Sequence, residues 1–192
     1  MGIAVVGGRQ LNAAALVVGP RDGAGATLIE MAHELEFAQV ERYRGMVAAE
    51  RQAEAVSLLF FLCAAVNDVR TLKPTAEAVR SSSNTTIKFA PLIYLGSNSS
   101  AANIRLCIQM GFDDVIALPC AGRDLNERIL RQVEQRRVYY ETASYFGPDR
   151  RDRASAPRGG AGAGVGEFRR IEIIRRLATG IDVLSGYDQV EV

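Results

Sequence analysis

Residues 91–119 read PLIYLGSNSSAANIRLCIQMGFDDVIALP and contain one complete strand, helix and strand. The run at 92–95 is apolar at every position, which is typical of a strand buried on both faces of a parallel sheet. Ser100 is suited to cap a helix whose apolar residues recur at helical spacing. Gly111 can close that helix, and residues 114–119 form the next strand. The stretch therefore predicts one unit of a parallel α/β sheet.

The rest of the chain repeats this alternation. Strands are expected at 14–18, 38–43 and 57–62, and helices at 23–35, 46–56, 74–80 and 123–139. The most apolar run, SLLFFL at 57–62, belongs in the centre of the sheet, and the more polar 38–43 belongs at its edge. Such alternation requires a parallel sheet with right-handed crossovers. The predicted fold class is α/β, flavodoxin-like, with a five-stranded parallel sheet in the order 2-1-3-4-5.

The 192 residues are enough for one domain and an appendage. We expect a leader at 1–12, a domain at 13–140 and an Arg/Gly-rich C-terminal extension at 141–192. Within the extension, residues 168–176 and 181–184 flank a turn and predict a small hairpin. The alternative is a segment that becomes ordered only when it docks on a partner or on its own domain.

Charge and cysteine content exclude several classes of function. Lys and Arg total 23 against 22 acidic residues, so the net charge is +1, and neither nucleic acid nor an anionic membrane is expected as a partner. No apolar run reaches the roughly 20 residues that span a bilayer. The three cysteines form no CxxC pair and there is one histidine, which argues against disulfides and metal sites. These features favour a protein of the reducing cytoplasm.

Several strand ends resemble those of the receiver domain of bacterial two-component response regulators. The likeness covers about residues 12–140, in the segments LVVGP (16–20), SLLFFLC (57–63), LIYLGS (92–97) and GFDDVIALP (111–119). It implies a CheY-like fold and a role in bacterial signalling. It also implies a site at the carboxyl ends of the strands, where an aspartate accepts a phosphoryl group with the help of Mg²⁺.

The side chains that this site needs are replaced in the present sequence. Gly19 and Pro20 occupy the positions of the family's acidic pair, and Leu62 (or Cys63, if the register slips) that of its phosphoacceptor aspartate. Gly96 replaces the family's Thr or Ser, and Leu118 replaces its lysine; only Pro119 matches. None of these replacements can accept phosphate or hold Mg²⁺ through oxygen. Asp22, Asp68 and Asp113 lie nearby in sequence, and a cap or turn role is expected for each. The prediction is a pseudo-receiver that is no enzyme and uses no cofactor or metal.

In the resembled family, the fourth helix, fifth strand and fifth helix form the face used for dimerisation and partner binding. In this chain that face would carry Arg105, Gln109, Asp113, Arg128, Arg131 and Gln132. The resemblance therefore implies a protein partner from a signalling pathway and a homodimer.

An alternative function rests on Arg150, Arg151 and Arg153, because the planar guanidinium fork suits phosphate recognition. This cluster resembles the arginine cluster of the PilZ domain, although the DxSxxG part of that motif is missing. The alternative function is thus that of a cyclic dinucleotide (c-di-GMP-like) effector. The structural interpretation of the same arginines is that they are solvated charges balanced by nearby acidic residues. A phosphate loop at 19–27 is a weaker hypothesis, since no lysine follows the glycines and GxGxxG is not matched.

Overall fold

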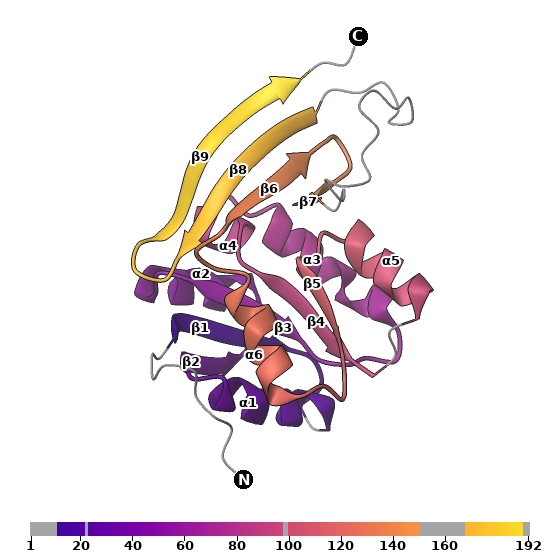
Figure 1. The fold of residues 1–192 in the computed structure, drawn as a ribbon. Helices are drawn as coiled ribbons and strands as arrows, with labels where there is room; N and C mark the ends of the chain where they lie inside the picture. The colour runs from indigo at the N-terminus through magenta and orange to yellow at the C-terminus, as the bar shows by residue number, and fades with distance from the viewer. Residues whose placement is uncertain (1–10, 22, 98–99, 150–167, 190–192) are drawn as a thin grey trace.

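The computed structural model describes residues 11–21, 23–97, 100–149 and 168–189 (Figure 1). Five parallel strands form the first sheet in the order β2-β1-β3-β4-β5. Their bounds are Leu11–Val18 (β1), Phe37–Arg42 (β2), Leu59–Cys63 (β3), Leu92–Gly96 (β4) and Asp114–Ala117 (β5). The predicted fold class is confirmed, with SLLFFL supplying the central strand and β2 at the edge. The expected leader, 1–12, falls almost wholly outside the described residues.

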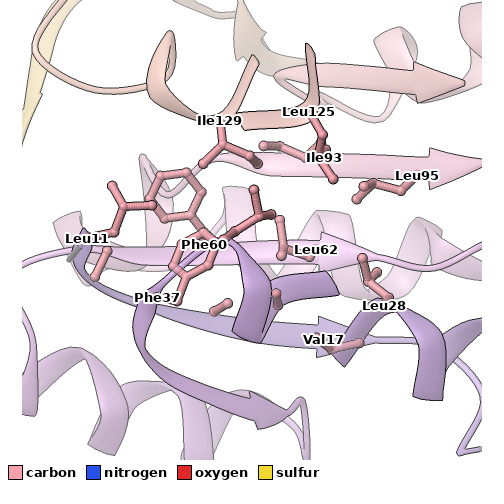
Figure 2. Packing of buried hydrophobic residues seen from close by; sticks show 14 of the residues in the cluster. Leu11, Val17, Leu28, Phe37, Phe60, Leu62, Ile93, Leu95, Leu125 and Ile129 are labelled. Atoms are coloured by element: carbon pink, nitrogen blue, oxygen red, sulfur yellow. The ribbon is translucent and has the colours of Figure 1, made fainter. Parts of the chain in front are cut away.

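Helices cover both faces of this sheet. They are α1 (Ala24–Glu34), α2 (Met46–Ala55), a 3-10 turn η1 (Val69–Leu72), α3 (Lys73–Arg80), α4 (Thr85–Lys88), α5 (Ala101–Gln109) and α6 (Gly122–Leu130). Alternate residues of a strand point to opposite faces, so β3 contributes to two cores. Phe60 and Leu62 pack with Leu28 of α1 and Leu125 of α6 (Figure 2). Leu59, Phe61 and Cys63 pack with residues of α2, α3 and α5, including Ala49, Val79 and Cys107.

The unit at 91–119 forms as its sequence predicts. The Ser100 hydroxyl accepts a hydrogen bond from the Asn103 backbone N–H at 3.2 Å, which caps the first turn of α5. Gly111 takes a φ of 82°, a left-handed conformation that favours glycine and closes the helix. The following strand then returns to the sheet, where Tyr94 pairs with Val115.

The prediction of a helix at 123–139 is right for the first half of this range and wrong for the second. Helix α6 ends at Leu130, and Glu134 turns the chain with a φ of 56°. Residues Arg136–Glu141 form a strand, β6, of a second sheet. The apolar spacing continues past the helix end because Val133 still packs in the first core, whereas Tyr139 is buried in a different cluster. The helical spacing therefore joined Val133 of the first core with Tyr140, which is half-buried in the following strand, into one apparent helix face.

The second sheet is antiparallel and has the order β7-β6-β8-β9. The remaining bounds are Phe146–Pro148 (β7), Phe168–Arg176 (β8) and Gly180–Gln189 (β9). Strands β8 and β9 pair antiparallel over the segments where the sequence predicts a small hairpin, and they belong to a larger sheet. The expected domain limit at residue 140 falls inside β6, so the division of the chain is not a simple cut at that point.

The second sheet lies against the amino ends of the parallel strands. The Asn12 side-chain amide, in β1, donates to the carbonyl of Leu177 at 3.4 Å. The Ser57 hydroxyl, just before β3, donates to the carbonyl of Ala178 at 3.2 Å. Figure 1 shows the arrowheads of β4 and β5 pointing away from β8 and β9. The carboxyl ends of the strands are thus at the opposite end of the molecule from this contact.

Candidate functional site

The carboxyl edge of the first sheet gathers the positions singled out in the sequence. Gly19 and Pro20 follow β1 and are exposed. Strand pairing places Val18 beside Cys63, and Cys63 beside Tyr94. It also places Gly96 beside Ala117, the residue before Leu118. The predicted positions therefore meet at one edge.

Two of these positions have no room for a larger side chain. A Cβ added to Gly19 would lie 2.8 Å from the Cβ of Ala64. At Gly96 it would lie 2.5 Å from the hydroxyl oxygen of Tyr94, because that ring folds over the glycine. Tyr94 is 1% exposed, and its burial raises the pKa of its hydroxyl. The aromatic ring fills the space that a hydroxyl-bearing residue at 96 would occupy.

Both candidates for the phosphoacceptor position are closed off from solvent. Leu62 and Cys63 are each 0% exposed and point into opposite cores. Burial raises the pKa of the Cys63 thiol, and the neighbouring Cys107 adds to this effect. The thiol is therefore protonated at neutral pH and is not a nucleophile there.

The acidic residues near this edge have structural roles where they are described. Asp68 accepts hydrogen bonds from the Arg70 backbone N–H at 2.9 Å and from its Nε at 3.0 Å, and so caps η1. The backbone bond, followed by the side-chain bond, lowers the pKa of Asp68. Asp22 lies outside the described residues. In the part of the chain that the structure covers, no three His, Cys, Asp or Glu side chains come together as metal ligands.

The predicted interaction face is exposed only in part. Arg105, Gln109 and Arg131 are exposed. Arg128 is half-buried and donates two hydrogen bonds to the Asp114 carboxylate, one of 3.0 Å from Nε and a shorter one from Nη2. The prediction is wrong for the other two members of this face. Asp113 is 8% exposed and Gln132 is 3% exposed, so neither offers its side chain to a partner.

Asp113 instead lies at the centre of a buried polar network between the two sheets. Its carboxylate accepts from Arg80 of α3 at 2.5 Å, from Arg175 of β8 at 2.6 Å and from the Leu92 backbone N–H at 2.9 Å. The Tyr139 hydroxyl of β6 makes a further, short hydrogen bond to it. One carboxylate therefore bonds groups from four separate segments of the chain.

The two guanidinium groups are also satisfied by backbone carbonyls. Arg80 donates to the carbonyls of Gly111, Lys88 and Ala90 at 2.8 to 2.9 Å. Arg175 is 0% exposed and donates to the carbonyl of Phe89 at 2.7 Å and to that of Gln132 at 3.2 Å. Gln132 also accepts through its side-chain oxygen at 3.3 Å. Such complete pairing is what allows charged groups to be buried.

The network keeps Asp113 ionised despite its burial. Burial alone would raise the pKa of this carboxyl, but Arg175, Arg80 and the Tyr139 hydroxyl outweigh it and hold the pKa well below its ordinary range. The pKa of Arg175 is raised by Asp113 and Tyr139 in spite of its own burial. Burial raises the pKa of the Tyr139 hydroxyl as well, so that it acts as a donor.

Sequence reasoning missed this network. Arg80 and Arg175 are 33 and 62 residues from Asp113, so no local motif joins them. One signal was present in the segment FRRIEIIRR, where strand alternation places Arg175 on the same face as Ile171 and Ile173. An arginine on the apolar face of a strand indicates a buried ion pair, because an isolated charge is too costly there.

Comparisons with known proteins find receiver domains among the solved structures. No protein-family profile matches the chain, and no curated protein does. The receiver domain of the sensor histidine kinase PA1611 from Pseudomonas aeruginosa PAO1, solved with a magnesium ion in its active-site cleft, is similar in structure. It is 20% identical over 65% of this chain and 98% of that one, with a TM-score of 0.42. The response regulator RPA3017 of R. palustris is 18% identical over 60% of this chain and 87% of that one, with a TM-score of 0.41.

The first sheet and its helices have a receiver-like fold. We call residues 11–130 the receiver-like domain, and strands β6 to β9 the second sheet. Over the described residues, no helix is long and apolar enough to cross a membrane. Arg150, Arg151 and Arg153 lie outside the described residues, and the cyclic dinucleotide alternative stays a prediction.

Proposed function

We propose that the chain is a receiver-like signalling module that acts through a protein partner without being phosphorylated itself. The chemistry of the carboxyl edge carries the proposal. Phosphotransfer to a receiver needs a carboxylate nucleophile, acidic ligands for Mg²⁺ and a cation for the phosphoryl oxygens. The positions at this edge are held by Gly19, Pro20, Leu62 (or Cys63), Gly96 and Leu118, which supply none of these groups.

The same residues do not fit a magnesium ion. Mg²⁺ prefers hard oxygen ligands, chiefly carboxylates, in a near-octahedral arrangement. Glycine and proline side chains have no oxygen, and the buried Cys63 thiol, whose pKa burial raises, is a poor ligand for a hard cation. Tyr94 further occupies the space above Gly96. No step of the proposed function therefore passes through a metal or a phosphoaspartate.

Partner recognition is proposed for the exposed part of the α5–β5–α6 face. Arg105 and Gln109 project from α5, and Arg131 follows α6 beside Leu130, which is 40% exposed. Asp114 holds Arg128 in a fixed position between these elements. Exposed arginines on a face that also carries an exposed leucine suit a protein surface with carboxylates, because the guanidinium fork bonds carboxylates in a bidentate manner. We expect signalling proteins, and a second copy of this chain, as partners.

The direct test is incubation of the purified protein with acetyl phosphate and Mg²⁺, followed by intact-mass spectrometry. The expected result is no phosphorylated species. A receiver domain that retains its acidic pair and aspartate, treated in parallel, should gain one phosphoryl group. A hydroxylamine-sensitive phosphoryl adduct on this chain would overturn the proposal.

The partner face is tested separately, by affinity capture with the intact protein as bait. Arg105→Glu and Arg131→Glu should each weaken recovery of the captured protein, since both arginines are exposed on the face. Arg51→Glu is the matched control, because it reverses an exposed arginine on α2, away from the face. Equal loss of binding in the control would show that total charge, and not this face, governs capture.

A further inference from the structure

The carboxyl end of helix α6 is held by arginines of the second sheet. Backbone carbonyls at a helix end have no partner within the helix and need one elsewhere. Arg137 of β6 donates a short hydrogen bond from Nη2 to the Arg131 carbonyl, and Arg175 of β8 donates to the Gln132 carbonyl at 3.2 Å. Cations at this end of a helix also favour the negative pole of its dipole. The second sheet therefore caps α6.

This end of α6 belongs to the proposed partner face. Arg131 is exposed, and Leu130 beside it is 40% exposed. On its other flank α6 is tied to β5, because Arg128 bonds the Asp114 carboxylate. The bond from Arg137 thus reaches the face at one of its own members.

Arg137 is an unfavourable residue at this position. It lies two residues before the buried Tyr139, on the same side of β6, and its side chain is half-buried. Its Nε is buried, and the described part of the chain offers it no hydrogen-bond acceptor. Burial, and then the nearby charge of Arg175, lower the pKa of this guanidinium. A buried donor without an acceptor costs free energy, so stability alone does not account for this arginine.

We infer that Arg137 is a positioning residue of the partner face, through which the second sheet fixes the end of α6 in the orientation that the partner meets. The inference rests on the proposed function and adds a means of regulation, because a shift of the second sheet would move the end of α6 with it. Polar groups that are kept in an unfavourable environment call for a functional explanation. The connection runs from the amino ends of the parallel strands, so it requires no modification of the carboxyl edge.

The first test separates positioning from stability. Arg137→Met removes the bond to the Arg131 carbonyl together with the buried Nε–H. We expect its urea midpoint to equal or exceed that of wild type, while recovery of the protein captured by wild type falls about fivefold or more. Arg137→Lys keeps a charged donor without the buried Nε–H and should restore most of the recovery. Arg136→Met is the matched control, because Arg136 is exposed and lies on the opposite side of β6.

Hydrogen exchange of the free protein tests the inference without any partner. The backbone N–H groups of 131–134 are all hydrogen-bonded in the capped end of α6 and the turn after it. In Arg137→Met they should exchange about threefold to tenfold faster, as the loss of one hydrogen bond predicts, while amides of β3 keep their protection. Unchanged exchange at 131–134 would overturn the inference and leave the proposed function standing.

The remaining outcomes are equally decisive. A lower urea midpoint in Arg137→Met would show that the arginine serves stability, which would overturn the inference. So would an equal loss of capture in Arg136→Met, or capture that is weakened by Arg105→Glu but not by Arg137→Met. If neither Arg105→Glu nor Arg137→Met weakens capture, the proposed partner face is wrong and the inference falls with it.

Discussion

The guanidinium group of Arg175 and the carboxylate of Asp113, 62 residues apart in the sequence, form an ion pair of 2.6 Å at the junction of the two sheets. Both side chains are almost completely removed from water. Arg80 completes the arrangement from the other side, so that one carboxylate faces two cations. Such a network is a weak source of net stability, but breaking it is costly because it leaves a buried charge without a partner.

Replacement of Asp113 should therefore destabilise the whole chain. Asp113→Asn removes the only carboxylate that the described structure places against Arg80 and Arg175. We expect the free energy of unfolding, measured with urea, to fall by about 3 to 5 kcal/mol. Glu127→Gln is the control, because its ion pair with Arg123 is exposed, and it should cost less than about 1 kcal/mol. Equal effects of the two changes would contradict this account of the junction.

The same carboxylate should make stability depend on pH in the acidic range. Its pKa is lowered in the folded state, from an unfolded value of about 3.9, so the unfolded chain binds the proton more readily. The stabilising contribution of the Asp113 carboxylate is present at pH values above its pKa in the unfolded chain. It is lost as the pH falls toward the lower pKa of this carboxyl in the folded protein. Urea unfolding from neutral pH downward should therefore show the difference between wild type and Asp113→Asn narrowing below about pH 4. A difference that does not change with pH would contradict this prediction.

Gly96 offers a test of how the carboxyl edge is filled. Gly96→Ser restores a hydroxyl at this position, but its Cβ would lie 2.5 Å from the Tyr94 hydroxyl oxygen. We expect the change to cost about 1 to 3 kcal/mol, as overpacking of a core does. In a Tyr94→Leu background the same change should cost less, because the ring is gone. A double-mutant cycle by urea unfolding measures this coupling, and strict additivity would show that the ring and the glycine do not compete.

The cyclic dinucleotide alternative has its own test. Isothermal titration calorimetry with c-di-GMP compares the intact protein with a variant in which Arg150, Arg151 and Arg153 are alanine. If the alternative function is right, the wild type binds and the triple variant loses about tenfold or more in affinity, since charged hydrogen bonds to phosphate are lost. If the chain acts through a protein partner alone, neither protein shows heat of binding. Arg123→Ala serves as the control for general loss of positive charge.

The parallel sheet was predictable from the sequence because its signals are local. Apolar runs such as 59–63 and 92–95 mark buried strands, and Ser100 and Gly111 mark the ends of the helix between two of them. The strand order then follows from general rules on crossovers. The positions at the carboxyl edge were predictable for the same reason, since each lies at or directly after the end of a strand.

The second sheet and the junction were harder to predict because they depend on distant contacts. The segment RRVYYE forms strand β6, yet its sequence does not alternate clearly, and Val133 and Tyr140 match the helical spacing that continues from α6. Asp113 was expected in a turn because it closely follows the helix end at Gly111, and on an exposed face because the resembled family uses that face for binding. Its burial is set by Arg80 and Arg175, which only the folded chain brings together.

The contact between Arg175 and the receiver-like domain bears on how function can be mapped in this protein. Truncation after residue 149 would delete β8 and β9 and leave Asp113 and Tyr139 facing water on one side. A shortened chain that loses activity would therefore report a damaged core and not the loss of a binding tail. Point substitutions at exposed residues are the appropriate tool for assigning roles to the C-terminal region.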